Sequence, residues 1–265
     1  MAQLTGNLEF TGSLGNISAY RRKGSDKIIV RTKGGAKKAR IKKDANFAST
    51  RRINSEFGGR ATASKFLMQA IGPLRPLADY NIAGPLNALT RPIQAMDTVS
   101  AWGERNINFT ALPHLLEGFN VNNRTPFYSI IQNPLSYELA KTAGTGLVRF
   151  PALIPGVNFF VPEQYAFYQL LVSVGFVSNV VYTPYGYRAL YDFSSHAQLT
   201  DSAWHSVKTG SPAENLEAKW TQPIDAAILQ ETIMILSVGI RFGRPEYGSI
   251  NPFQSVGGGI LLGVV

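Results

Sequence analysis

The sequence predicts an α+β fold in which an N-terminal basic β-hairpin and a helical layer precede an antiparallel β-sandwich body that is jelly-roll-like. Three observations predict it: cationic residues gather near the N-terminus, a helical pattern follows them, and Val-, Ile- and aromatic-rich runs fill the second half. The chain has 265 residues, 45% of them hydrophobic, enough for a sizeable core. We expect a hairpin and arm over residues 1–43, a helical segment over 44–105 and the β-sandwich body over 106–265.

The hairpin is predicted from two short runs of β-favouring residues, Asn16–Arg21 and Lys27–Lys33. They flank Lys23–Asp26, where Gly, Ser and Asp favour a turn. In the second run Ile28 and Val30 share one face, so one side of the strand can pack while the other carries charge.

A cationic arm follows the hairpin after Gly34 and Gly35. Five basic residues occupy seven positions: Lys37, Lys38, Arg40, Lys42 and Lys43. Such a run is typical either of a solvated or mobile surface or of a binding site. Upstream of the hairpin, Gly12 and Gly15 indicate a bulge or a close backbone approach.

The helical segment begins at Asp44, a favourable N-cap. Side chains spaced by three and four form one stripe: Phe47, Thr50, Asn54, Phe57, Ala61, Ser64, Met68 and Ile71. The pair Gly58–Gly59 predicts a kink or a close helix crossing. Prolines then restrict the layer to short helices, predicted over Leu74–Asn81 and Leu86–Trp102.

The β body is predicted from runs rich in Val, Ile and aromatic residues, separated by turn-forming residues: Gly146–Phe150, Ala166–Tyr182, Ile228–Phe242 and Gly259–Val265. Alternation in the third run gives one apolar face and a second face that becomes polar toward its end. The last strand, Ile260–Val265, is apolar, so it must pair within the sheet or with a neighbouring subunit.

No set of residues predicts a reaction, and we expect that the protein is not an enzyme. The chain has no cysteine and three histidines, and it lacks the nucleophile elbow, the phosphate loop and the dinucleotide-binding turn. His205 follows Asp201 by four residues and His196 follows Asp192 by four, but neither pair has a third ligand, which favours a structural role. We expect no cofactor, no bound metal and no catalytic residue.

The charge distribution indicates an anionic partner. Residues 1–65 hold 15 of the 26 Lys and Arg but four of the 17 acidic residues, a net charge of +11, and the remainder carries −2. Nucleic acid, lipid head groups and an acidic patch on another copy all fit this charge. The predicted contact residues are cations of the hairpin, the arm and the following helix: Arg21, Arg22, Lys23, Lys27, Arg31, Lys33, Lys37, Lys38, Arg40, Lys42, Lys43, Arg51 and Arg52.

The cellular location is predicted from two absences. The first residues do not form a secretory signal, and no apolar run has the character of a membrane-spanning helix. We therefore expect a cytoplasmic protein without a membrane span.

Aromatic residues are concentrated in residues 159–168 and 182–193. They fit a hydrophobic core or a subunit interface, where Tyr and Phe are enriched. Stacking on nucleic-acid bases is disfavoured because Arg188 is the one basic residue in these two windows.

The N-terminal pattern also resembles a known group of sequences. The shared residues are Gly12, Gly15, Asn16, Tyr20, Lys23, Gly24, the run Arg31–Gly35, the Arg- and Asn-rich helix around Phe57, and Leu116–Asn120. In these residues the chain is similar to a family of uncharacterised Bacteroidetes proteins of about the same length. The resemblance covers the chain as far as Thr125, and it implies no activity and no catalytic residues.

Two functions of different classes fit these features. The first is a structural protein that self-assembles into a filament, tube or shell, with the hairpin and arm contacting neighbouring subunits. The second is a nucleic-acid-binding protein in which the arm and the adjacent helix neutralise phosphates. The two can coexist, because a tube can be lined by basic arms around nucleic acid. An enzyme would need acidic or histidine side chains brought together from distant parts of the chain.

Overall fold

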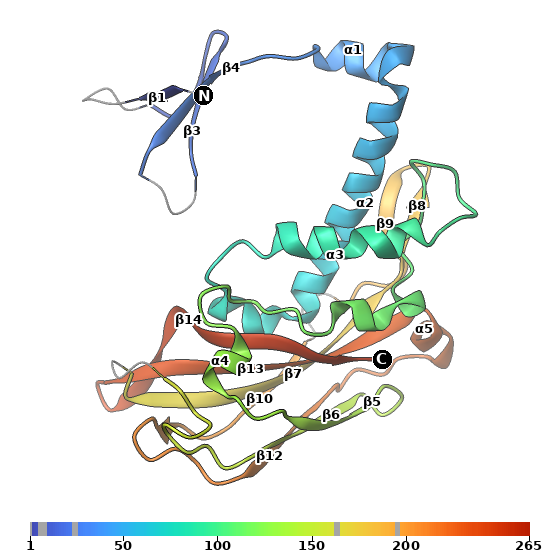
Figure 1. The fold of residues 1–265 in the computed structure, drawn as a ribbon. Coiled ribbons are helices and arrows are strands. Elements are labelled where there is room, and N and C mark those ends of the chain that lie inside the picture. The colour runs from blue at the N-terminus through green and yellow to red at the C-terminus, as the bar shows by residue number, and fades with distance from the viewer. Residues whose placement is uncertain (1, 5–9, 23–25, 162–164, 194–196) are drawn as a thin grey trace. The chain divides into compact units, whose positions relative to one another are not determined.

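The computed structural model of the chain is α+β, with helices and several antiparallel sheets (Figure 1). It describes residues 2–4, 10–22, 26–161, 165–193 and 197–265. The chain divides into two compact units, Met1–Arg51 and Arg52–Val265, and each is described by itself.

The first unit contains a four-stranded antiparallel sheet with strand order β1-β4-β3-β2. Its strands are β1 (Ala2–Leu4), β2 (Gly12–Leu14), β3 (Ile17–Arg21) and β4 (Ile28–Thr32). The pairing of β3 with β4 confirms the predicted hairpin, although residues 23–25 of its turn lie outside the described residues. Gly15 has a φ of 55° in the tight turn that joins β2 to β3. Of the two alternatives predicted for Gly12 and Gly15, a bulge or a close backbone approach, the second is not seen: no atom of the described residues would lie within 4 Å of a β-carbon at either position.

Part of the cationic arm is helical, and its basic residues are exposed; the sequence had left open whether this segment is a solvated surface or a binding site. Its residues form helix α1 (Lys38–Lys43), followed by the 3-10 turn η1 (Ala45–Phe47) and helix α2 (Ala48–Ala70). Asp44 caps η1 as predicted, because its carboxylate accepts a hydrogen bond of 3.0 Å from the backbone amide of Asn46.

The buried face of α2 differs from the predicted stripe. Asn54, Phe57 and Ala61 are exposed, and the buried positions are Glu56, Gly59, Ala63, Ser64, Leu67 and Ala70. The helix also continues through Gly58–Gly59 without a break. The close approach at Gly59 is made by an aromatic ring, since a β-carbon there would lie 2.7 Å from the ring of Tyr187.

The rest of the helical layer is shorter than expected. It consists of the 3-10 helix η2 (Gly72–Leu77) and helix α3 (Ala83–Ala95), with shorter turns η3 (Phe109–Ala111), η4 (Pro113–Leu116) and α4 (Phe127–Ile130) beyond it. The prediction that the second helix reaches Trp102 is wrong. The chain turns at Asp97, whose carboxylate accepts hydrogen bonds from the amides of Val99, Ser100 and Asn106.

The β part of the second unit contains a five-stranded and a three-stranded antiparallel sheet. The larger sheet has the order β10-β7-β13-β14, with β11 also paired to β7, and comprises β7 (Phe167–Ser178), β10 (Gln198–Asp201), β11 (His205–Ser206), β13 (Thr232–Glu246) and β14 (Ser249–Val264). The smaller sheet has the order β12-β6-β5, from β5 (Ser136–Ala140), β6 (Thr145–Phe150) and β12 (Glu214–Lys219). A separate hairpin joins β8 (Val180–Thr183) to β9 (Gly186–Ala189).

Two of the predicted β runs are divided. Ala166–Tyr182 is split between β7 and β8 at Asn179, whose side chain donates a 2.7 Å hydrogen bond to Glu231. Ile228–Phe242 begins in the short helix α5 (Ala226–Gln230) and becomes β13 only at Thr232.

Both faces of the larger sheet are buried, because helices cover one face and the smaller sheet covers the other (Figure 1). The predicted alternation of β13 is confirmed. Met234, Leu236 and Val238 pack toward the smaller sheet, whereas Ile233 and Ile235 pack toward the helices.

Glycines let the helices sit close against the larger sheet. A β-carbon on Gly175 of β7 would lie 2.3 Å from the carbonyl oxygen of Ala70, and one on Gly239 of β13 would lie 2.8 Å from Leu77. The apolar last strand, β14, pairs with β13 inside the sheet. Its other edge is covered where the Leu261 carbonyl accepts a 2.9 Å hydrogen bond from the Gly118 amide.

Candidate functional site

The predicted cationic residues of the first unit lie on or next to β3, β4 and α1, apart from Arg51 in the first turn of α2. All those that the structure describes are exposed except Arg51, which is half-buried. Lys23 lies outside the described residues. Arg31 places its guanidinium 5.6 Å from the centre of the Tyr20 ring. Lys33 donates a 3.0 Å hydrogen bond from Nζ to the carbonyl oxygen of Gly15, which ties β4 to the turn before β3.

Helix α1 carries the densest positive charge. Lys37, Lys38, Lys42 and Lys43 are exposed and form no ion pair with the residues that the structure describes: their ammonium groups face solvent. Arg40 differs from them, because its guanidinium lies 3.1 Å from the carboxylate of Asp44. The backbone amide of Asn46, and then Arg40, lower the pKa of Asp44.

Arg51 and Arg52 have internal contacts. Arg51 donates hydrogen bonds of 2.8 Å from Nη1 to the carbonyl oxygens of Ile41 and Asp44, so it satisfies free carbonyls at the end of α1. Arg52 belongs to the second unit, where its guanidinium lies 5.4 Å from the centre of the Trp102 ring. The first of these contacts makes Arg51 part of the scaffold that orders the cationic helix.

The first unit has very little core. Among residues 10–22 and 26–51, the buried hydrophobic side chains are Ala19 and Ile28, and α1 buries none. The outer strand β2 pairs on one side, with β3, and its residues are exposed. Leu14 on this strand has 67% of its surface exposed. Within the described residues, the β2 edge of the sheet is therefore unpaired and carries an exposed apolar side chain.

A second candidate site, which the sequence did not indicate, lies in the second unit between α2, α3 and the loop after α3. This cleft has a volume of about 560 Å³ and is lined by Ile53, Glu56, Arg60, Arg91, Gln94, Ala95, Trp102 and Arg105. No sequence pattern predicts this cleft, because its charged residues come from three segments with no shared motif or spacing. We call it the arginine cleft.

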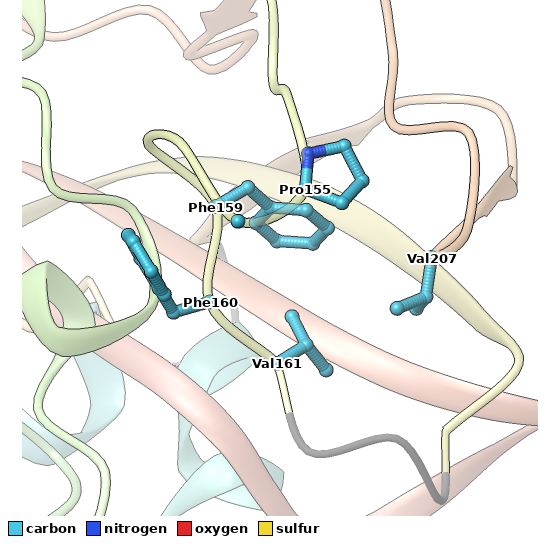
Figure 2. Close-up of a pocket in the computed structure, with 6 residues that line it drawn as sticks. Pro155, Phe159, Phe160, Val161 and Val207 are labelled. Carbon is cyan, nitrogen blue, oxygen red and sulfur yellow. The ribbon is translucent and has the colours of Figure 1, made fainter.

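An apolar pocket of about 370 Å³ lies beside the segment that contains Phe159 (Figure 2). Pro155, Gly156, Phe159, Phe160, Val161 and Val207 line it. None of these residues carries a titratable side chain. Among the described residues that line the pocket, none supplies an acid, a base or a nucleophile.

His114 and His205, the histidines that the structure describes, each lie beside one glutamate. His205 on β11 contacts Glu214 at 3.2 Å, whereas Asp201 pairs with Arg241 at 2.8 Å, so the four-residue spacing of Asp201 and His205 does not produce a pair. His196 lies outside the described residues. No group of three potential metal ligands occurs in the described parts of the chain.

Within the same described ranges, every helix is too short or too polar to cross a bilayer. Comparison with known proteins gives no relative: no protein family, no curated protein and no solved structure matches this chain.

Proposed function

We propose that this protein is a structural protein that self-assembles into a filament, tube or shell through its N-terminal unit. The observation that carries the proposal is the small core of that unit: among residues 10–22 and 26–51, the buried hydrophobic side chains are Ala19 and Ile28. Small sheets with so little buried surface are marginal by themselves. A neighbouring subunit would supply the missing apolar contact.

The open edge of β2 suggests how a neighbour would bind. An unpaired edge strand offers backbone donors and acceptors to a strand of another chain. Leu14 adds an exposed apolar contact at this edge. The residues after position 65, with a net charge of −2, make another copy a compatible partner for the basic unit. A jelly-roll-like sandwich in the second unit would form the body of each subunit.

Electron microscopy of a matched pair of variants tests this proposal. Leu14→Asp places a charge at the open edge, and Val157→Asp places the same charge at a site in the second unit with nearly equal exposure, 66% against 67%. Negative staining should show regular polymers of the unaltered protein and of Val157→Asp, and dispersed particles of Leu14→Asp. Deletion of residues 1–43 should leave a folded monomer, measured by circular dichroism and gel filtration.

Two results would reject the proposal. If the unaltered protein formed dispersed monomers at all concentrations, the proposal of self-assembly would be wrong. If Leu14→Asp formed the same polymers as the unaltered protein, the β2 edge would not be the contact between subunits.

Nucleic-acid binding is the second candidate, favoured by the exposed lysines of α1. Neutralising phosphates releases counterions, so affinity for a DNA or RNA duplex should fall steeply with salt. Lys42→Ala with Lys43→Ala should weaken binding and reduce the salt dependence, whereas Arg51→Ala, which removes an internal contact, leaves these charges in place. The ratio of absorbance at 260 and 280 nm of the purified polymer shows whether nucleic acid is enclosed. Affinity that does not change with salt would exclude this function.

A further inference from the structure

The arginine cleft has a rigid floor built around Glu56 of α2. The Glu56 carboxylate is buried and accepts two hydrogen bonds from Arg105, of 2.6 and 2.8 Å, and one of 3.1 Å from the amide of Gly103. Hydrogen bonding from Arg105 lowers the pKa of Glu56, so the acid is ionised at neutral pH. The charge of Arg105 is thus matched within the protein.

A second polar side chain in the floor positions Arg60. Gln94 of α3 is almost fully buried, and its Oε1 accepts a 2.7 Å hydrogen bond from Nη1 of Arg60. The other end of Gln94 donates a 3.0 Å hydrogen bond to the carbonyl oxygen of Arg105. Asn87 also accepts a hydrogen bond from Nε of Arg60, at 3.3 Å. These neutral partners fix the guanidinium and leave its charge unmatched.

Arg91 adds further positive charge to the same cleft. Burial lowers the pKa of Arg60, and the negative charge of Glu56 raises it. The positive charge of Arg91 also lowers the pKa of Arg60, because the two guanidinium groups repel each other. Arg91 is exposed on α3 and forms no ion pair with any residue in the described ranges. With three arginines against one glutamate, the lining carries a net charge of +2.

The rim of the cleft is apolar. Trp102 is 44% exposed, and Ile53 of α2 is exposed on the same lining. The guanidinium of Arg52 lies over the Trp102 ring, at the distance of a cation–π contact. The cleft therefore combines two unmatched guanidinium groups with an indole ring, in a volume suited to a small molecule.

We propose that the arginine cleft binds the oxyanion group of a small molecule, a phosphate or a carboxylate, between Arg60 and Arg91. Guanidinium groups bind both classes through paired hydrogen bonds. The apolar part of the ligand packs on Trp102. Because Gln94 and Glu56 already hold the floor, the ligand binds without ordering the site first.

Isothermal titration calorimetry on the full-length protein tests the proposal with pyrophosphate, adenosine monophosphate and citrate. Arg91→Gln removes one unmatched charge, and Arg75→Gln is the matched control, because Arg75 is exposed on η2 and does not line the cleft. Arg91→Gln should weaken binding by about tenfold, as expected for the loss of a charge-assisted hydrogen bond. Arg75→Gln should leave the affinity unchanged.

The comparison among ligands distinguishes the two sources of the oxyanion. Tighter binding of the two phosphates identifies a phosphorylated ligand, and tighter binding of citrate identifies a carboxylate. If adenosine monophosphate binds more tightly than pyrophosphate, and this difference in affinity disappears in Trp102→Ala, the adenine ring stacks on the indole ring of Trp102. Absence of binding by all three probes, equal weakening by Arg75→Gln, or full binding by Arg91→Gln would overturn the proposal.

Discussion

Glu56 and Arg105 form a two-pronged ion pair, with Nε to Oε1 and Nη2 to Oε2 distances of 2.6 and 2.8 Å. The pair joins helix α2 to the loop after α3, and the Glu56 side chain is almost fully buried. Removing one partner of a buried pair leaves the other charge poorly solvated. The pair therefore fixes which face of α2 points inward.

Glu56→Gln should lower the free energy of unfolding by about 2 kcal/mol, because Arg105 loses its counter-charge. Urea denaturation followed by circular dichroism measures the change. Glu138→Gln is the matched control, since Glu138 pairs with Arg149 at the surface and exposed pairs contribute little. If both variants lost the same free energy of unfolding, burial of the Glu56–Arg105 pair would not add to its contribution to stability.

The stability of the second unit should depend on pH through Asp97. Burial by itself raises the pKa of Asp97, but hydrogen bonds from Ser100, Asn106 and Val99 outweigh it and lower the pKa to about 2. Since the unfolded pKa is about 3.9, ionised Asp97 stabilises the fold above that pH, and this contribution is lost as the pH falls toward 2.

Asp97→Asn should therefore reduce stability at pH 7 by about 1 to 2 kcal/mol, allowing for solvent screening, and should flatten the change between pH 4 and pH 2. Urea denaturation at a series of pH values gives both quantities. If Asp97→Asn lost as much stability between pH 4 and pH 2 as the unaltered protein, the acid sensitivity would arise from other carboxylates.

Adjacent glycines in α2 should respond in opposite directions. Gly58→Ala meets no atom within 4 Å, and it should stabilise the helix by about 0.5 to 1 kcal/mol through propensity alone. Gly59→Ala would bring a β-carbon 2.7 Å from the ring of Tyr187, which is held by a 3.0 Å hydrogen bond to the Arg105 carbonyl. It should destabilise the protein by about 1 to 3 kcal/mol. Thermal denaturation measures the stability of both variants. A higher stability of Gly59→Ala as well would show that the Tyr187 ring moves aside at little cost.

Arg51→Gln should loosen α1 without changing its lysines. Its guanidinium holds the carbonyls of Ile41 and Asp44, so its loss exposes the end of the helix. Hydrogen exchange followed by mass spectrometry should show faster exchange of the amides between Arg40 and Asp44. Arg22→Gln, a change at an exposed position just after β3, should leave that exchange rate unaltered.

The sequence by itself determined the elements whose signals are local. Turn-forming residues between two β-favouring runs predicted the β3–β4 hairpin, the Asp44 cap predicted the start of the helical segment, and alternation predicted the two buried faces of β13. These patterns work because capping and strand alternation depend on neighbours a few residues apart.

Only the tertiary structure decided which face of α2 is buried. The three- and four-residue spacing placed Phe57 on the predicted stripe, which did not include Glu56, yet Phe57 is exposed and Glu56 is buried. A carboxylate is buried when a distant partner compensates its charge, and Arg105 lies 49 residues along the chain. The arginine cleft depends on the same long-range contacts between segments, so no local pattern in the sequence could reveal it.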